Sequence, residues 1–435
     1  MKKTLLSVSV ILATIAVYAA ASINSVIVRQ QWPWNNKVHI DFVLTDPDSL
    51  SHDVSLVLRN DGVEIPFTRS EIAGEFENLA PGLHRFVWDP SGVEFTLTDK
   101  LTATIEITDD PKKYLILDLT DGYSAEGQIP YSWTSRVPGG GWFPSANYTY
   151  RNNKIVFRRI KAGSFLMGSP ETEEGRSAQC ERQRQITLTK DYYMAIIPLT
   201  GNQAMRIYNS VEEGTPGNNT HAFVSYGYMR GKGSITNWPA IGEDSFCGVL
   251  NTRTAFRATE LPGYRFDLPT AAQWEYACRA GTTTAHPNGT EVNLQIDPAP
   301  GSRGSATYDP GLEDIAVYLY NRCLANGTWP DYYPILKPNN WGLHMMLGSG
   351  WELIREGIAW NFNNWGTGAI ESVDGEGTVS YRSEYFWGRG GSHASEAGSC
   401  RSASWCAIAT NMDGRGEYYG GHIDAVRLCL TYVGE

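Results

Sequence analysis

The first part of the chain alternates apolar and polar positions in short runs. Val38–Leu44 places apolar side chains at every second residue, and Leu101–Ile107 does the same against threonine and glutamate. This period of two is typical of a strand with one buried face. A further strand is indicated at Gly82–Asp89, and Asn60-Asp61-Gly62 signals a hairpin turn. We therefore predict a small β-sandwich of immunoglobulin or fibronectin type over residues 22–118.

The pattern changes after this region. Residues 119–153 contain three consecutive glycines at 139–141 and three prolines, which predicts a linker or an extended arm that lies over the next domain. Over residues 154–435 regular periodicity is sparse, while glycine and tryptophan are dense. No catalytic residues cluster in the first domain, so we interpret it as an attachment, spacing or binding module.

One helix in the second domain is clear. Ala271–Ala280 holds no glycine or proline, and Thr270 can cap its start. Gln273, three residues after Thr270, completes a capping box, and Gly281 can end the helix. Tyr264–Leu268 is predicted to be a strand that leads into it.

Composition and length indicate a folded protein with more than one domain. The chain has 435 residues, too many for one ordinary core, and 42% of them are hydrophobic while 19% are charged. Its 14 Trp, 23 Tyr and 44 Gly suit a loop-rich fold held together by aromatic packing, and a sugar-binding surface is the alternative use of these aromatic residues.

The N-terminus has the pattern of a secretory signal peptide. Lys2 and Lys3 precede an apolar run from Leu5 to Ala20, and small residues at 19–21 form a cleavage site. We expect residues 1–21 to be removed and the protein to be secreted, periplasmic or at the cell surface, with no membrane span after cleavage. An uncleaved N-terminal anchor is the alternative. Cleavage would change the net charge from −11 to −13, which disfavours nucleic acid as a partner.

The seven cysteines all lie beyond the first third of the chain, and no two are spaced as C-x-x-C. This excludes a zinc ribbon and a thioredoxin-type motif. In an exported protein thiols tend to pair, and an odd number leaves at least one unpaired within the chain. The acidic segment Glu171–Glu174 is interpreted as a solvated loop. None of the eight histidines has the i, i+4 spacing of a helical metal site, although a meeting of His393 and His422 in space is an alternative iron or copper site.

Four stretches of the second domain occur in a fixed order. They are Phe165–Ser169, residues 266–282 (FDLPTAAQWEYACRAGT), residues 336–353 (LKPNNWGLHMMLGSGWEL) and residues 388–403 (GRGGSHASEAGSCRSA). Together they resemble the motifs of the formylglycine-generating enzyme family, also called sulfatase-modifying factors, over about residues 155–432.

The resemblance implies an α+β fold of the C-type-lectin-like kind, with a small twisted sheet, about two helices and much irregular backbone. It also implies an activity, because members of the family oxidise a cysteine of a sulfatase peptide to formylglycine. They use oxygen and a copper ion held by two cysteines, and soft thiolates are the ligands that Cu(I) prefers. The same fold also displays variable C-terminal loops that bind ligands.

The resemblance carries over only part of the catalytic site. Ser392 matches the serine of the family's Gly-Gly-Ser turn, and Cys400 matches its second active-site cysteine. The first cysteine is replaced by Ser395, whose hydroxyl cannot substitute for a thiolate toward Cu(I). Trp351 matches the first tryptophan of the family's W-E-W motif, and Leu353 stands in place of the second. If the site is active, Cys400, Ser392 and Trp351 are its expected catalytic residues.

The family's calcium site is also changed. Glu352 keeps a carboxylate, and Gly348 and Gly350 offer carbonyl groups. The usual acidic or amide ligand has become Met345, whose thioether is a poor ligand for a hard cation, and Ser349 replaces the usual asparagine. Calcium therefore remains the candidate metal of an eroded site, while the missing thiol argues against copper.

The resemblance further implies two disulfides, although the cysteine positions match those of the family only approximately. Cys278 stands where formylglycine generators have a disulfide cysteine, and Cys406 is one position out of step with its partner. Cys247 and Cys429 form the second implied pair. Geometry is needed to decide either pairing.

These observations leave three functional hypotheses. The first is an exported, divergent member of the family that lacks the two-cysteine copper oxidation, with Cys400 as a structural cysteine. The second is an active oxidoreductase with altered metal chemistry. The third is a secreted protein that binds a peptide, protein or glycan ligand through residues 392–424 on the lectin-like scaffold.

Overall fold

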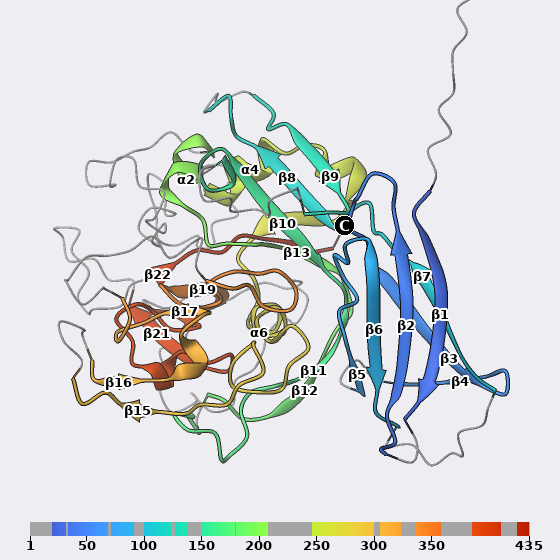
Figure 1. The fold of residues 1–435 in the computed structure, drawn as a ribbon. Helices are drawn as coiled ribbons and strands as arrows, with labels where there is room; N and C mark the ends of the chain where they lie inside the picture. The colour runs from blue at the N-terminus through green and yellow to red at the C-terminus, as the bar shows by residue number, and fades with distance from the viewer. Residues whose placement is uncertain are drawn as a thin grey trace, which may run out of the picture. The chain divides into compact units, whose positions relative to one another are not determined.

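The computed structural model describes most of the chain, namely residues 20–31, 34–67, 71–90, 100–122, 127–137, 149–178, 180–207, 246–299, 305–322, 336–357, 385–409 and 424–434. Residues 1–19 of the expected signal peptide, Cys323 and His422 lie outside this part. The chain divides into two compact units, Met1–Asp110 and Pro111–Glu435 (Figure 1). No helix within the described residues is long and apolar enough to cross a membrane.

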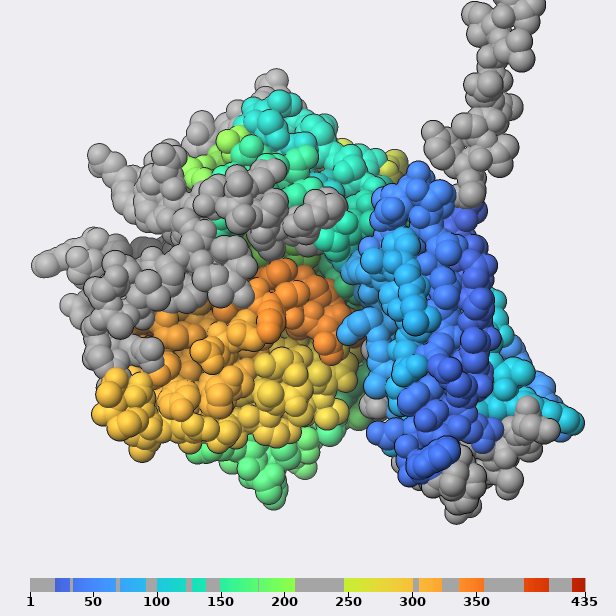
Figure 2. Space-filling view, viewed as in Figure 1, coloured from blue at the N-terminus to red at the C-terminus, as the bar shows by residue number. Residues whose placement is uncertain are grey.

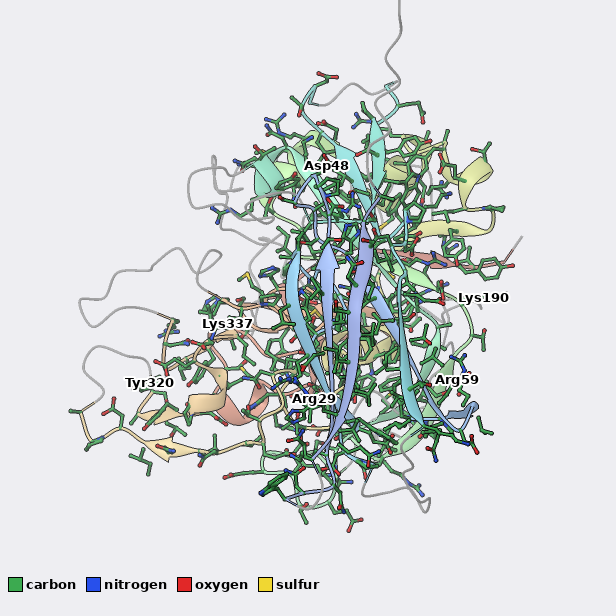
Figure 3. The ribbon with its side chains drawn as sticks, turned by 45° about the vertical axis from the view of Figure 1, so that its right-hand side comes forward. Arg29, Asp48, Arg59, Lys190, Tyr320 and Lys337 are labelled. Carbon is green, nitrogen blue, oxygen red and sulfur yellow. The ribbon has the colours of Figure 1, made fainter. Side chains whose placement is uncertain are left out.

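The N-terminal unit is built from two antiparallel sheets. One sheet has the order β1-β2-β6-β5, and its strands are β1 (Ser22–Gln30), β2 (Val38–Thr45), β6 (Gly82–Trp88) and β5 (Ile72–Ala73). The other has the order β4-β3-β7, with β4 (Val63–Ile65), β3 (Val54–Asn60) and β7 (Leu101–Ile107). Figure 3 labels Arg29 on β1 and Arg59 on β3, one from each sheet. In its described residues this unit is all-β, as the sequence predicted.

The alternation in the sequence is confirmed as a buried face. Val38, Ile40 and Phe42 of β2 are fully buried and belong to one core cluster, which also takes apolar residues of β3 and β7. The predicted hairpin turn is confirmed as well, because Asp61 and Gly62 join β3 to β4 and both have positive φ, 50° and 82°. A two-residue loop with two positive φ angles matches the right-handed twist of the strands.

The C-terminal unit contains a six-stranded antiparallel sheet with the order β14-β23-β13-β10-β8-β9. Its strands are β14 (Tyr264–Asp267), β23 (Cys429–Tyr432), β13 (Tyr192–Ala195), β10 (Lys154–Ile160), β8 (Tyr114–Asp118) and β9 (Tyr131–Thr134). The sequence placed residues 111–118 in the first domain and 119–153 in a linker. In the structure β8 and β9 are instead strands of this sheet.

The inner strands of the six-stranded sheet are buried on both faces, which explains why they lack the alternating pattern. Leu115 and Leu117 of β8 pack into a first core cluster, while Tyr114 and Ile116 pack into a second. Neighbouring residues of a strand point to opposite faces, so the two clusters lie on opposite sides of the sheet. We call them the first and second core clusters below.

The remaining strands form smaller sheets. A four-stranded sheet has the order β21-β20-β19-β22, with β21 (Trp405–Ala409), β20 (Tyr385–Arg389), β19 (Trp351–Gly357) and β22 (Asp424–Ala425). Three two-stranded sheets pair β11 (Gly163–Met167) with β12 (Arg184–Leu188), β15 (Gln295–Ile296) with β16 (Thr307–Tyr308), and β17 (Ala316–Val317) with β18 (Leu347–Gly348). Figure 2 shows residues coloured yellow to orange gathered on one face of the C-terminal unit.

The helices of the C-terminal unit are short. They are α1 (Thr149–Asn152), α2 (Gly201–Ile207), α4 (Phe246–Thr252), α5 (Arg257–Glu260) and α6 (Ala271–Arg279), with 3-10 turns η4 (Pro310–Leu312) and η6 (Ala397–Ser399). A mixed, strand-rich unit with few helices is consistent with the fold that the resemblance implies.

Helix α6 forms as its sequence predicts. Gln273 donates its backbone N–H to the Thr270 hydroxyl at 3.1 Å, and the Thr270 amide donates to the Gln273 side chain at 3.0 Å. The helix ends in Ala280 and Gly281, which both have positive φ. The capping box is therefore confirmed, and it directs the chain from β14 into a helix that is buried along most of its length.

Replacing the capping residue tests this origin of α6. We expect Thr270→Ala to lower the free energy of unfolding of the C-terminal unit by about 1–2 kcal/mol, because the Gln273 amide loses its acceptor in a buried place. Urea unfolding followed by tryptophan fluorescence measures it. The control is Thr259→Ala, an exposed threonine whose loss should change the free energy by less than about 0.5 kcal/mol. Equal effects of the two variants would contradict the role of the cap.

Candidate functional site

The Gly-rich turn that follows β20 lies tightly against Cys400. Gly390 and Gly391 have φ of 84° and 86°, a region that favours glycine. A Cβ added at Gly391 would lie 2.6 Å from the Cys400 Sγ, and one added at Gly390 would lie 2.4 Å from the Met346 carbonyl oxygen. The carbonyl of Gly390 also accepts the amide of Gly348 at 2.8 Å. The turn therefore needs both glycines, and it joins the segment after β20 to the segment before β19.

Cys400 is a buried thiol. Its exposed fraction is 0%, and it packs in the second core cluster with Ala397 and Leu347. Burial raises the pKa of the Cys400 thiol to about 12, although Arg401 and the Gly348 backbone act in the opposite direction. The group is therefore a neutral thiol in the interior at physiological pH.

Two serine hydroxyls occupy the place where the family has its serine and its first cysteine. The Ser392 and Ser395 hydroxyl oxygens are 3.0 Å apart, and the Ser392 amide donates to the Ser395 oxygen at 3.0 Å. The Ser395 backbone amide in turn donates to the Ser392 carbonyl at 2.9 Å. Ser392 is buried and Ser395 is half-buried. These hydrogen bonds between Ser392 and Ser395 stabilise the turn. The two hydroxyl oxygens are hard, neutral ligand atoms, unlike a thiolate sulfur.

His393 lies between the two serines in sequence. Its ring nitrogen Nδ1 is 2.9 Å from the Ser349 carbonyl oxygen, so Nδ1 carries the proton and donates it. Burial lowers the pKa of His393, while the hydrogen bond to Ser349 works in the opposite direction. Ser349 itself has a positive φ of 64°, and its buried hydroxyl has no hydrogen-bond partner among the described residues. The proposed meeting of His393 with His422 falls outside the described residues.

Trp351 is not brought to Cys400. Trp351 belongs to the first core cluster, where it packs with residues such as Leu353, while Cys400 belongs to the second. Of the three expected catalytic residues, Ser392 directly follows Gly391, the glycine that packs against Cys400, whereas Trp351 belongs to the other core cluster.

The carboxylate of Glu352 is already fully engaged. Arg427 donates to both of its oxygens, at 2.6 Å to Oε1 and 2.8 Å to Oε2, and the Trp274 indole donates to Oε2 at 2.6 Å. Glu352 is 1% exposed and Arg427 is 0% exposed. The Gly348 carbonyl accepts the amide of Gly350 at 2.7 Å. These residues do not fit the expected calcium site, because the one carboxylate is neutralised by an arginine.

No other metal site is evident in the described part of the chain. No group of three or more histidine, cysteine, aspartate or glutamate side chains there is arranged to hold an ion. The sequence predicted three metal ligands, Glu352, Gly348 and Gly350. In this structure the oxygen atoms of Glu352 and Gly348 accept hydrogen bonds from the protein instead.

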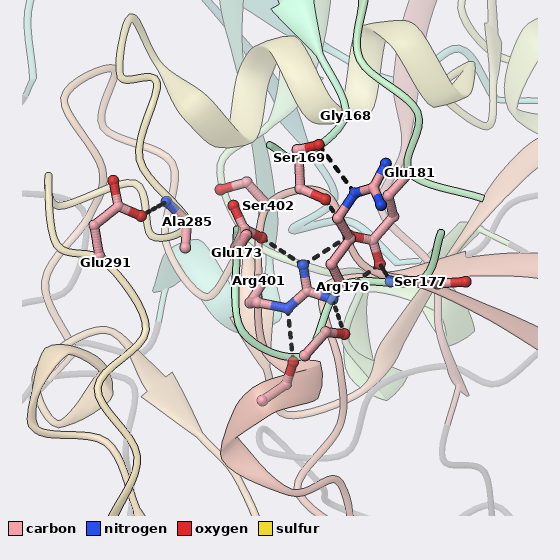
Figure 4. Close-up of polar contacts among 12 residues, drawn as sticks. Gly168, Ser169, Glu173, Arg176, Ser177, Glu181, Ala285, Glu291, Arg401 and Ser402 are labelled. Carbon is pink, nitrogen blue, oxygen red and sulfur yellow. Dashed lines mark hydrogen bonds and ion pairs between the residues drawn. The ribbon is translucent and has the colours of Figure 1, made fainter. Parts of the chain in front are cut away.

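Sequence reasoning missed a clamp that Arg401 forms beside the candidate site. Its guanidinium donates to the carboxylates of Glu173 and Glu181 and to the carbonyls of Gly175 and Gly398 (Figure 4). These bonds use all five of its N–H groups. The side chains of Arg401, Glu173 and Glu181 are 1%, 2% and 1% exposed. The interpretation of residues 171–174 as a solvated loop is therefore wrong for Glu173, because a partner more than 200 residues away buries it.

A second buried charge lies on helix α6. Glu275 accepts hydrogen bonds from Arg279, Arg389 and the Gly168 amide, and the two arginines lower its pKa against the opposing effect of burial. The guanidinium of Arg389 also stacks near Trp274 and Trp405, at 5.3 Å and 4.2 Å from the ring centres. This pairing connects α6 to the start of the Gly-rich turn.

The two implied disulfides are not seen in the structure. Cys180, Cys247, Cys278, Cys400 and Cys429 are free thiols there. Cys278 lies in the second core cluster whereas Cys406 packs against the first, and Cys247 lies in the first whereas Cys429 lies in the second. Each implied pair is therefore divided between the two faces of the six-stranded sheet, and register alone could not reveal this.

The Arg401 clamp can be tested by removing its charge. We expect Arg401→Met to lower the free energy of unfolding by about 3–5 kcal/mol, because two glutamates then remain buried without a partner. The control is Arg182→Met, since Arg182 is exposed and should contribute less than about 0.5 kcal/mol. Chemical denaturation compares the variants with the parent protein. A loss below about 1 kcal/mol for Arg401→Met would contradict the clamp.

Thiol mapping tests the cysteine assignment. We expect alkylation of the unfolded protein, without prior reduction, to label Cys180, Cys247, Cys278, Cys400 and Cys429, as read by peptide mass spectrometry. In the native protein Cys400 should react at least about tenfold more slowly than the half-buried Cys180, because it requires local opening. A disulfide-linked peptide that contains Cys278 would contradict the structure.

Comparisons with known proteins agree with the motif order. Residues 145–416 match the family model described as the sulfatase-modifying factor enzyme 1-like domain. No curated protein matches the chain. Similar solved structures include PvdO from Pseudomonas aeruginosa, at 17% identity with a TM-score of 0.38, covering 63% of this chain and 94% of that one. Variable protein 1 of Treponema denticola is similar at 16% identity with a TM-score of 0.40, covering 64% and 95%. Because the family model matches more than half of the chain, this protein belongs to the family of the sulfatase-modifying factor enzyme 1-like domain.

Proposed function

We propose that this protein is a divergent, exported member of its family that does not oxidise sulfatase cysteines by the two-cysteine copper route. The observation that carries the proposal is Ser395, whose hydroxyl stands at the first cysteine's position and is bound to Ser392. Cu(I) prefers two soft sulfur ligands, and a neutral hydroxyl is hard. With Cys400 as the single thiol of the site, Cu(I) would lack its second sulfur ligand.

The state of Cys400 supports the same proposal. With a pKa of about 12, roughly one thiol in 10⁵ is ionised at pH 7. Only the thiolate is a good nucleophile and metal ligand, so a chemical role would first require the thiol to be exposed or its pKa lowered. Its packing against Gly391 gives Cys400 a structural role instead.

A second candidate is an oxidoreductase with altered metal chemistry, and one observation favours it. The Nδ1–H of His393 is fixed on a backbone carbonyl, which is how a metal-binding histidine is usually oriented. The half-buried side chain adjoins the serine pair. In this case iron or copper would be held by His393 together with residues outside the described part of the chain.

The family domain is proposed to bind a ligand rather than to catalyse. The ligand would be a peptide, a protein or a glycan, and the surface would come from residues 392–424, of which 410–423 lie outside the described residues. The all-β N-terminal unit, proposed to be immunoglobulin- or fibronectin-like, would serve as an attachment or spacer. The signal-like N-terminus supports a secreted, periplasmic or cell-surface location.

The copper route can be tested directly with a Cys-x-Pro-x-Arg peptide, copper and oxygen. We expect no peptide aldehyde by mass spectrometry, whereas a family member with both cysteines should produce it under the same conditions. Aldehyde formation that depends on Cys400, and is lost in Cys400→Ala, would overturn the proposal.

A matched variant separates the missing thiol from other causes. Ser395→Cys restores two cysteines five residues apart, and Ser395→Ala removes the hydroxyl without adding a sulfur. We expect Ser395→Cys to retain Cu(I) against bicinchoninate at least about tenfold better than the parent or Ser395→Ala, because two thiolates replace one. Equally strong retention by the parent protein would contradict the loss of the copper site.

A further inference from the structure

One face of the β1-β2-β6-β5 sheet in the N-terminal unit points away from the core. The core residues of β2 alternate with His39 and Asp41, which therefore point to the other side of the sheet. The strand register places Ile27 of β1 and Arg85 of β6 on either side of Asp41. Arg29 of β1 lies beside His39. We call six residues of this side the basic face, namely Ile27, Arg29, Lys37, Asp41, Leu83 and Arg85.

Asp41 lies at the centre of the basic face and is covered by two arginines. Arg85 donates to Oδ1 at 2.5 Å through Nε and to Oδ2 at 3.1 Å through Nη2. The guanidinium of Arg29, on the other neighbouring strand, contacts Oδ2 as well (Figure 3). The side chain of Asp41 is 7% exposed, whereas those of Arg29 and Arg85 are 51% and 49% exposed. One buried carboxylate therefore holds two half-exposed cations and neutralises only one of them.

Both arginines keep N–H groups for a further acceptor. A guanidinium has five N–H groups in a planar fork, and Asp41 is the only acceptor that Arg29 or Arg85 meets among the described residues. Because Asp41 already orients both side chains, a ligand would not have to order them when it binds. A second carboxylate matches this geometry, since a guanidinium binds a carboxylate through two parallel N–H···O bonds.

The basic face carries positive charge within an acidic unit. Residues 22–110 contain six Lys and Arg against fifteen Asp and Glu, a net charge of −9. The face holds three of those six cations and one of those acids. Its charge acts on His39, because burial is the largest cause that lowers the pKa of this histidine, and Arg85, Arg29 and Lys37 lower it further. The face is therefore an electropositive island that attracts an anionic partner.

Two exposed aliphatic side chains flank the arginines. Leu83 is 75% exposed and lies two residues before Arg85 on β6, and Ile27 is 48% exposed and lies two residues before Arg29 on β1. Side chains two residues apart on a strand lie on the same side of the sheet. The face thus presents the same pair twice, an aliphatic group next to a cation, and a matching partner would present an aliphatic group next to an anion.

Size and charge favour a protein segment as the partner. A nucleic acid, a charged polysaccharide or an anionic membrane extends beyond the face and is repelled by the rest of a unit whose net charge is −9. A second copy of the chain docked face to face would bring the two arginine pairs together. We propose that the basic face binds a segment of another protein in which a carboxylate side chain lies two residues from an aliphatic one. The carboxylate would bind the free N–H groups of Arg29 and Arg85, and the aliphatic side chain would pack on Leu83 or Ile27. This inference does not depend on the function proposed above for the C-terminal unit.

Peptide binding to the full protein, read by fluorescence anisotropy, tests the basic face. The probe is a labelled peptide of Glu-Gly-Leu-Gly repeats, and the matched neutral peptide has Gln in place of Glu. We expect the acidic peptide to bind with a Kd of about 1 mM or tighter at low ionic strength, and at least about tenfold more tightly than the neutral one. Arg29→Gln should weaken binding about tenfold, since it removes one guanidinium and leaves Asp41 paired with Arg85. Leu83→Asn should weaken binding about threefold, because the aliphatic contact is lost.

Arg59→Gln is the matched control. Arg59 lies on β3 of the other sheet, where it is 38% exposed and paired with Glu64, so its replacement removes the same charge away from the basic face (Figure 3). We expect it to change the Kd by less than about twofold. No binding of the acidic peptide, equal binding of both peptides, or an equal loss in Arg59→Gln and Arg29→Gln would overturn the proposal. Phosphatidylglycerol vesicles and heparin are tested in parallel, and tighter binding of either one that is lost in Arg29→Gln would overturn the choice of a protein segment.

Discussion

The C-terminal unit depends on the pairing of buried arginines with carboxylates from distant segments. Arg401 uses all five N–H groups on two glutamates and two carbonyls, and it fixes the loop that contains Glu173 and Glu181 against the segment after Cys400. An unpaired charge at these positions would cost several kcal/mol, so the segments cannot separate without a large penalty. This unit has short helices and much irregular backbone. Its buried arginine–carboxylate pairs therefore hold distant segments together, as long helices and strands do in other folds.

The same constraint limits what the site can do. Two further clamps repeat the arrangement, with Glu275 bound by Arg389 and Glu352 bound by Arg427. A carboxylate that neutralises a buried arginine is not available to a calcium ion, because the ion would leave the arginine unpaired. Glu352 therefore contributes to stability at the expense of metal binding. The loss of the other calcium-type side chains at Met345 and Ser349 is consistent with this exchange.

Features that depend on neighbouring residues could be predicted from the sequence. The alternation over Val38–Leu44, the turn at Asp61-Gly62 and the cap at Thr270 each need only a few adjacent positions, and the structure confirms them. Strand β8 could not be assigned to its sheet, because it is buried on both faces and does not alternate. The partners of Glu173 and the separation of Cys278 from Cys406 depend on contacts between segments far apart in the chain. Periodicity and motif register contain no information about such contacts.

The motif after β20 also shows why family membership and activity must be argued separately. Gly391 is required there because any larger residue would collide with the Cys400 sulfur, and Arg401 is required because two buried glutamates need its charge. Both residues are therefore needed by the fold, whether or not the site is catalytic. Only Ser395 reports on the copper chemistry, since it lies where a second thiol would be needed and instead supports the turn through hydrogen bonds. A motif match carried mostly by packing and charge pairing identifies the fold family, and the reaction has to be judged from the few side chains that the fold does not need.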